Sequence, residues 1–95
     1  MVRFEQEDNK EKGRFIMYEN EVLAGEITYT WSGETKFIID HTSVDPEFSG
    51  KGFGKQLVIK AVEFAKNNNL KVVPRCPYAK KVFDRNVDLQ QVLSH

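Results

Sequence analysis

The sequence predicts an α+β protein: a mixed, mostly antiparallel sheet of about five strands, crossed by one long helix and followed by a C-terminal helix. Three observations predict this class. Short alternating apolar segments fill residues 1–44, apolar residues repeat with helical spacing over 53–65, and a short strand and a second helix end the chain. A length of 95 residues suits one core, so we expect residues 1–95 to form a single domain.

The first half of the chain alternates apolar and polar residues as strands do. In residues 22–31, this alternation places Leu23, Ile27, Tyr29 and Trp31 on one face of the strand. Polar turns separate the segments, which predicts an antiparallel meander. The four predicted strands cover residues 2–7, 14–19, 22–31 and 36–44.

The second half changes from strand to helix periodicity. The helix that starts near Phe53 has an apolar stripe, and the asparagines at 67–69 end it. Residues 70–73 form a short fifth strand, and Pro77 suits the first turn of a second helix. The long helix therefore connects the fourth and fifth strands, which we expect to be parallel.

Composition argues against several classes of protein and site. A single cysteine excludes an internal disulfide, and with only two histidines we expect no metal site. The N-terminus is charged and has no apolar run, so we expect no signal peptide. No segment is long and apolar enough to span a membrane. We therefore expect a cytoplasmic protein without a membrane partner.

The charges are divided unevenly along the chain, although they cancel overall. Residues 1–47 hold eleven acids and five bases, a balance of −6, and residues 48–95 hold three acids and nine bases, a balance of +6. This is either solvated surface charge or a sign that one half meets a cation and the other an anion. Nucleic acid is not an expected partner, because the basic residues do not alternate with aromatic side chains on which nucleobases could stack.

A glycine-rich segment, "SGKGFG" at residues 49–54, stands between the fourth strand and the long helix. Glycine allows backbone N–H groups to converge, and a helix N-terminus offers unpaired donors, so this arrangement can hold a phosphate. Two familiar phosphate motifs do not fit. Gln56 follows Lys55 where a Walker loop needs Ser or Thr, and Lys55 occupies the sixth position of a dinucleotide fingerprint. The alternative is a tight structural corner.

The longer stretch "SVDPEFSGKGFGKQLV" at 43–58 resembles the acetyl-coenzyme A loop of the GNAT superfamily, the general-control-related N-acetyltransferases. Their pattern is Gln/Arg-x-x-Gly-x-Gly/Ala, and Ser49 stands here where Gln or Arg is usual. The resemblance covers most of the chain, including "VVPRCPYAKKVFDRN" at 72–86, and is to a short branch without the usual N-terminal helices. It implies a GNAT-like acyl-CoA N-acyltransferase fold.

The resemblance implies acetyl transfer from acetyl-coenzyme A (acetyl-CoA) to an amine, such as a protein or peptide lysine or a small molecule. The basic half then suits the polyanionic coenzyme, and the acidic half suits the cationic amine. Two other functions stay open. One is a sensor that binds acetyl-CoA without turnover, and the other is an interaction module in which the glycine turn is structural.

The resemblance also implies which residues bind acetyl-CoA. The fourth strand lies beside the thioester, and the glycine loop holds the diphosphate. Two lysines add charge unless they are solvated surface residues, and Phe83 borders the coenzyme arm unless it packs in the core. The candidates are Thr42, Ser43, Val44, Ser49, Gly50, Lys51, Gly52, Phe53, Gly54, Lys55 and Phe83.

Three residues are candidates for catalysis. His41 could take the proton of the amine, or be a half-buried sheet histidine. Cys76 precedes a helix start and could carry the acetyl group, contact or protonate the leaving thiol, or be inert. The resemblance implies that Tyr78 is a candidate general acid, with packing as the alternative. Strand alternation places Asp40 on the face opposite His41, so the two are not paired.

Overall fold

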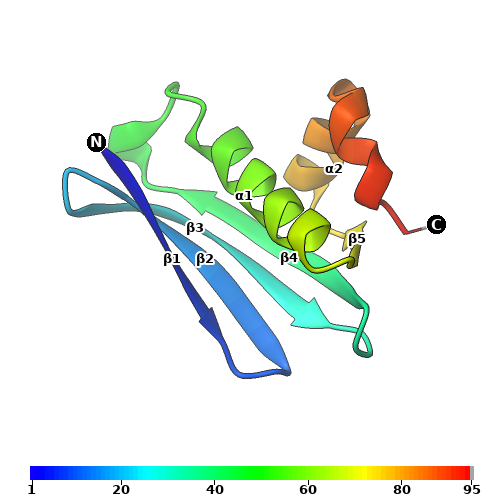
Figure 1. Ribbon diagram of the computed structural model, residues 1–95. Coiled ribbons are helices and arrows are strands. Elements are labelled where there is room, and N and C mark those ends of the chain that lie inside the picture. Colours follow the sequence, from blue (N-terminus) through cyan, green and yellow to red (C-terminus); the bar gives the residue numbers. More distant parts are fainter. Residues whose placement is uncertain (95) are drawn as a thin grey trace.

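The computed structural model describes residues 1–94 and shows a five-stranded sheet with helices packed against it (Figure 1). Its elements are β1 (Val2–Asp8), β2 (Lys12–Glu19), β3 (Val22–Trp31), β4 (Lys36–Val44), the 3-10 helix η1 (Pro46–Phe48), α1 (Phe53–Asn67), β5 (Lys71–Pro74), α2 (Pro77–Arg85) and the 3-10 helix η2 (Val87–Val92). No helix within residues 1–94 combines the length and the apolar character needed to cross a membrane.

The strands follow one another across the sheet in the order β1-β2-β3-β4-β5. The pairings β1–β2, β2–β3 and β3–β4 are antiparallel, and β4 and β5 are parallel because α1 carries the chain between them. The predicted fold class and the helical crossover are thus confirmed. In Figure 1, α1 lies over the sheet and α2 lies beside α1, above the edge that β4 and β5 form.

The apolar stripe of α1 and the middle of the sheet form the core. Leu57, Val58 and Val62 of α1 are fully buried, as the helical spacing predicted. On the sheet, the ring of Tyr29 packs against the ring of Phe37, with 4.9 Å between their centroids. Burial of such side chains contributes about 1.5–3 kcal/mol each, which makes this layer the main source of stability.

One expectation about strand β3 is wrong: Leu23 is 56% exposed. The register between β2 and β3 shifts beside Met17 and Tyr18, which face Gly25 and Leu23, so Ala24 is an extra residue on β3. Ala24 and Gly25 are both buried, although they are adjacent in sequence. A bulge of this kind breaks the two-residue alternation, and Leu23 therefore points to solvent.

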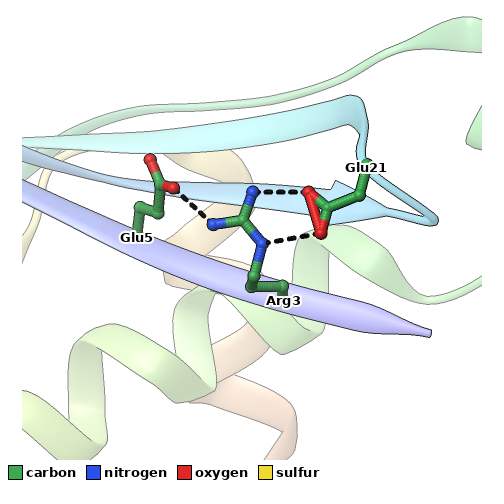
Figure 2. Close-up of polar contacts among 3 residues, drawn as sticks. All are labelled: Arg3, Glu5 and Glu21. Atoms are coloured by element: carbon green, nitrogen blue, oxygen red, sulfur yellow. Dashed lines mark hydrogen bonds and ion pairs between the residues drawn. The ribbon is translucent and has the colours of Figure 1, made fainter.

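The edge strand β1 is held to the β2–β3 turn by a charged cluster (Figure 2). Arg3 donates from Nε and Nη2 to the two carboxylate oxygens of Glu21, at 3.2 and 2.7 Å, and from Nη1 to Glu5. The hydrogen bonds to Glu21, and then the one to Glu5, raise the pKa of Arg3. Glu21 has a φ of 67°, which is unusual for a residue with a side chain. The pairing of its carboxylate with Arg3 gives a reason for glutamate at this turn position.

A second polar cluster surrounds Asp8 at the other end of β1. The Tyr29 hydroxyl and the Trp31 ring N–H donate to Asp8 Oδ2 at 2.6 and 2.9 Å, and the Lys10 N–H donates to Oδ1 at 2.7 Å. Burial alone raises the pKa of Asp8, but the three hydrogen bonds outweigh it and hold the pKa below its usual value of 3.8.

We expect Asp8→Asn to lower the melting temperature at pH 7 and to have little effect in strong acid. A carboxyl with a depressed folded-state pKa stabilises the fold above its unfolded value, and this contribution disappears as pH falls through the folded value. The melting temperatures of the wild type and Asp8→Asn should therefore converge below about pH 4. Thermal melts by circular dichroism from pH 2 to 7 measure this, with the exposed Glu63→Gln as control. A difference that stays constant with pH would contradict the assignment.

Candidate active site

The glycine loop connects η1 to α1 and adopts a left-handed backbone at two positions. Gly50 has a φ of 80° and Gly52 a φ of 75°. Apart from the adjacent residues in the chain, no residue among 1–94 has an atom within 4 Å of the place that a Cβ would take at either position. Backbone conformation therefore requires these two glycines, and close packing does not. Gly52 is the N-cap of α1, so the loop directs the chain into the first turn of the helix.

The first turn of α1 presents free backbone donors. The Gln56 N–H donates to the Gly52 carbonyl at 3.1 Å, which is the first hydrogen bond of the helix. Within the described residues, the N–H groups of residues 52–55 have no acceptor. Unpaired N–H groups and the positive end of the helix dipole attract an anion. This corner of the molecule therefore has the donors that a diphosphate requires.

A cleft of about 440 Å³ opens at this corner. It contains seven of the eleven candidate acetyl-CoA residues, together with Tyr78 from α2 and one residue that was not predicted, Phe48. The Phe48 ring stacks on the Phe53 ring, with centroids 5.8 Å apart. An aromatic residue directly before the glycine loop was the available signal for it. The residues lining the cleft are Thr42, Val44, Phe48, Ser49, Gly50, Gly52, Phe53, Gly54 and Tyr78.

Four candidate residues do not line this cleft. Ser43 and Lys55 are exposed. Lys51 is also exposed, and its Nζ lies 5.5 Å from the centre of the Phe48 ring, beside the loop. Phe83 is 1% exposed and belongs to the core, so packing explains it.

Strands β4 and β5 separate at the level of this cleft. Their pairing ends at Ile39 and Pro74, whereas β4 continues to Val44. The N–H groups of Arg75 and Cys76 both donate to the Ile39 carbonyl at 3.1 Å, and the chain then enters α2. The last residues of β4 therefore have no β5 partner, which leaves a gap in the pairing between the two strands.

Cys76 lies in this gap as the N-cap of α2 and is 6% exposed. Its thiol contacts the Thr42 hydroxyl, with 3.7 Å between Sγ and Oγ1. Burial raises the pKa of Cys76, but the N–H groups of Ala79 and Tyr78 and the Thr42 hydroxyl act against it, and the net pKa lies below the usual value. Neither N–H group makes a full capping hydrogen bond, so they stabilise the thiolate mainly through their dipoles.

A larger groove, of about 1050 Å³, lies on the side of β4 away from the cleft. Thr28 and Thr30 line it and alternate on β3 with the buried Ile27 and Tyr29. The groove is therefore mainly on the sheet face that α1 does not cover. Its lining residues are Glu7, Asp8, Asn9, Lys12, Gly13, Arg14, Thr28, Tyr29, Thr30, Asp40, His41, Arg75 and Pro77.

The groove contains both His41 and Asp40, so the expectation that they lie on opposite sides is wrong. The register of β3 and β4 pairs Tyr29 with Ile39 and Thr28 with His41, which leaves Asp40 as an extra residue. This bulge interrupts the alternation of β4 and allows two consecutive side chains to line one groove.

The cleft and the groove lie next to each other at two pairs of consecutive residues. On β4, His41 lines the groove and Thr42 lines the cleft. At the start of α2, Pro77 lines the groove and Tyr78 lines the cleft. Since Thr42 and Cys76 are in contact, a thin partition of β4 and α2 separates the two openings.

The sequence profile of the GCN5-related N-acetyl-transferase family matches residues 14–92, which is most of the chain. The chain belongs to this family. A comparison with proteins of curated function finds no significant match. The acyl-CoA N-acyltransferase fold and the family's reaction class are those that the resemblance to the GNAT superfamily implied, so this protein is an acetyltransferase.

Solved structures agree with this assignment. A GCN5-like protein from Staphylococcus aureus is 34% identical, with a TM-score of 0.68 over 95% of this chain and 87% of that chain. A ribosomal-protein-alanine N-acetyltransferase from Brucella melitensis is 18% identical, with a TM-score of 0.71 over 92% of this chain and 64% of that one. A protein from Clostridium acetobutylicum solved with acetyl-CoA is 12% identical, with a TM-score of 0.68 over 90% and 88%. The last two similarities concern the fold.

The three candidate catalytic residues of the acetyltransferase surround the partition. His41 faces the groove, Tyr78 faces the cleft, and Cys76 lies between them. The groove is not strongly acidic, because its lining has three carboxylates and three cationic side chains. The division of charge between the two halves of the chain is therefore not reproduced in the groove.

Gly54 gives the Tyr78 ring its place in the cleft of the acetyltransferase. A Cβ at Gly54 would lie 2.7 Å from the Tyr78 hydroxyl and 2.8 Å from Cζ, closer than atoms in contact allow. Gly54 is in the first turn of α1 and has a helical backbone. The close approach of Tyr78 is therefore the structural reason for glycine here.

We expect Gly54→Ala to move the Tyr78 ring and to gain no stability in the wild-type background. In a Tyr78→Ala background, the same substitution should stabilise by about 1 kcal/mol, because alanine has the higher helix propensity. Urea unfolding of the four variants measures the coupling between the two sites. Equal effects of Gly54→Ala in both backgrounds would show that the ring does not occupy this position.

Proposed function

We propose that this acetyltransferase moves the acetyl group of acetyl-CoA directly to a primary amine, with a lysine side chain of a protein or peptide as acceptor. Acetyl-CoA occupies the cleft at the glycine loop, and the amine enters through the groove. The observation that carries this proposal is the partition of β4 and α2. Residues 41 and 77 line the groove, and the next residues, 42 and 78, line the cleft. Donor and acceptor can therefore approach one point from two sides.

The free N–H groups of residues 52–55 are the proposed diphosphate ligands. The part of β4 beyond Ile39, which β5 leaves unpaired, is the proposed wall for the coenzyme arm. Lys51 lies beside the loop and can add positive charge, although Ser49 cannot. The residues present thus fit a polyanionic thioester in the cleft.

In the proposed reaction, His41 accepts a proton from the acceptor ammonium, and the neutral amine attacks the thioester carbonyl carbon. A carbon–nitrogen bond forms, the carbon–sulfur bond breaks, and the coenzyme leaves as a thiolate that must be protonated. Cys76 is the proposed donor of that proton, since its sulfur lies at the partition and its lowered pKa makes the thiol a better acid. Tyr78 is the second candidate for this role. Direct transfer leaves no acetyl group on the protein.

The groove supports a side chain of a larger molecule as acceptor. It crosses four strands, β1 to β4, mainly on the sheet face opposite α1, and it is more than twice as large as the cleft. A lysine on a peptide could lie along it with its ammonium at His41. As part of this proposal, residues 1–95 act as one catalytic domain in the cytoplasm, where a lone cysteine stays reduced.

Two measurements test the function. Titration with acetyl-CoA should shift the backbone amides of residues 42–56, and coenzyme thiol release should require one class of amine from a panel of lysine peptides, peptide N-termini, polyamines and amino acids. Binding without thiol release for any amine would favour the sensor instead. Absence of binding would favour an interaction module and would contradict the proposal.

A further inference from the structure

We propose that Asp40 binds the ammonium group of the acceptor and places it beside His41. This inference rests on the proposed function, because it concerns the amine that enters the groove. It assigns the recognition of positive charge to one carboxylate and not to the acidic half of the chain as a whole.

The bulge in β4 is the first observation. Asp40 has no direct partner on β3, because Tyr29 pairs with Ile39 and Thr28 pairs with His41. Without the extra residue, Asp40 and His41 would point to opposite faces of the sheet. With it, both line the groove, at the end that meets the cleft. A bulge that redirects a side chain next to a reactive position is a recurrent device in active sites.

The second observation is how the Asp40 carboxylate is held. The Thr30 hydroxyl donates to Asp40 Oδ2 at 2.6 Å, in a partly buried position. Within residues 1–94, Oδ1 has no hydrogen bond and no cation pairs with Asp40. One oxygen therefore fixes the orientation, and the other remains available to a ligand with N–H donors.

The other two carboxylates of the groove are already engaged. Glu7 accepts from Arg14 Nε at 2.8 Å. Asp8 accepts from the Tyr29 hydroxyl, the Trp31 ring and the Lys10 N–H. Both oxygens of Asp8 accept hydrogen bonds, and the charge of Glu7 is paired with Arg14. Asp40, in contrast, has a free oxygen and no cationic partner among the described residues. A charge-assisted hydrogen bond contributes more than a neutral one, so Asp40 should dominate the affinity for the amine.

The ligand class that follows is an unbranched primary alkylammonium, such as the lysine side chain, and not its neutral analogue. Nα-acetyl-lysinamide is a suitable probe, and Nα-acetyl-norleucinamide has nearly the same shape without the charge. Both are titrated into the ¹⁵N-labelled protein in the presence of coenzyme A, which cannot donate an acetyl group. Acetyl-CoA binding is measured in a separate titration, without coenzyme A, from the amides of residues 52–55.

We expect the lysinamide to shift amides of residues 28–30 and 40–41 and the norleucinamide to leave them unchanged. Asp40→Asn should weaken lysinamide binding by at least about tenfold, because it removes the charge but keeps an oxygen for Thr30. Thr30→Val should weaken it severalfold, because the carboxylate loses its fixed orientation. Glu63→Gln, on the exposed side of α1, is the control and should bind as the wild type does.

Three results would overturn the inference: no lysinamide shifts in the wild type, equal shifts with norleucinamide, or wild-type affinity in both Asp40→Asn and Thr30→Val. Each is separable from a failure of the proposed function, in which the amides of residues 52–55 do not respond to acetyl-CoA. If Asp40→Asn does not fold, the Thr30→Val titration and the comparison of the two probes decide.

Discussion

Replacing Gly52 with valine should weaken acetyl-CoA binding by at least about a hundredfold, or about 2.7 kcal/mol. Gly52 has a φ of 75°, a left-handed conformation that costs a residue with a side chain about 1–2 kcal/mol and a β-branched one more. Relief of that strain would rotate the N–H groups at the start of α1 away from one another. Isothermal titration calorimetry with acetyl-CoA measures the loss.

Gly33→Val is the matched control for this substitution. Gly33 has a φ of 78°, and apart from its chain neighbours no described residue has an atom within 4 Å of the position its Cβ would take, as at Gly52. It lies in the β3–β4 turn, at the end of β4 away from the cleft (Figure 1). Both variants should lose similar stability, but only Gly52→Val should lose affinity. Equal affinity in the two variants would show that the loop does not bind the coenzyme.

Cys76→Ala should lower turnover by about 10- to 100-fold and leave acetyl-CoA affinity within about twofold of the wild type. The thiol is buried beside Thr42 at the partition, where it can give a proton to the departing sulfur, but it is not part of the glycine loop. Thiol release under saturating acetyl-CoA measures turnover, and calorimetry measures binding. Cys76→Ser, which keeps a weaker proton donor, should recover part of the lost rate.

The role of Cys76 as a proton donor also predicts how turnover changes with pH. A proton donor is active while it is protonated, so wild-type turnover should fall as pH rises through the lowered pKa of Cys76. That alkaline decline should be absent in Cys76→Ala. Wild-type turnover in the alanine variant would exclude Cys76 from the mechanism. An acetyl group on Cys76, detected by mass spectrometry after mixing with acetyl-CoA, would contradict direct transfer.

Periodicity was sufficient to predict the main elements of this fold. The switch from alternating to helical spacing near Phe53 gave the boundary between the meander and the crossover, and the buried side of α1 is the apolar stripe of the sequence. The glycine spacing led to the cleft because local backbone conformation determines where those N–H groups lie. Both features depend on residues close together in sequence, so sequence reasoning could reach them.

The features that sequence reasoning missed depend on contacts between distant segments. Leu23 is exposed, and Asp40 shares a groove with His41, because each neighbouring strand pairing contains one extra residue. Nothing in a two-residue alternation indicates where such a bulge falls. The groove also joins the β1–β2 hairpin to Arg75, which the sheet brings near and the sequence separates.

The central claim is that backbone donors at the start of α1 hold the diphosphate of acetyl-CoA. Its most direct test is a titration of ¹⁵N-labelled protein with acetyl-CoA, followed at the amides of Gly52, Phe53, Gly54 and Lys55. We predict that these four resonances move downfield together as their N–H groups acquire acceptors, with one shared dissociation constant. If acetyl-CoA binds while these four amides stay unchanged, the diphosphate lies elsewhere and the proposed arrangement of donor and acceptor is wrong.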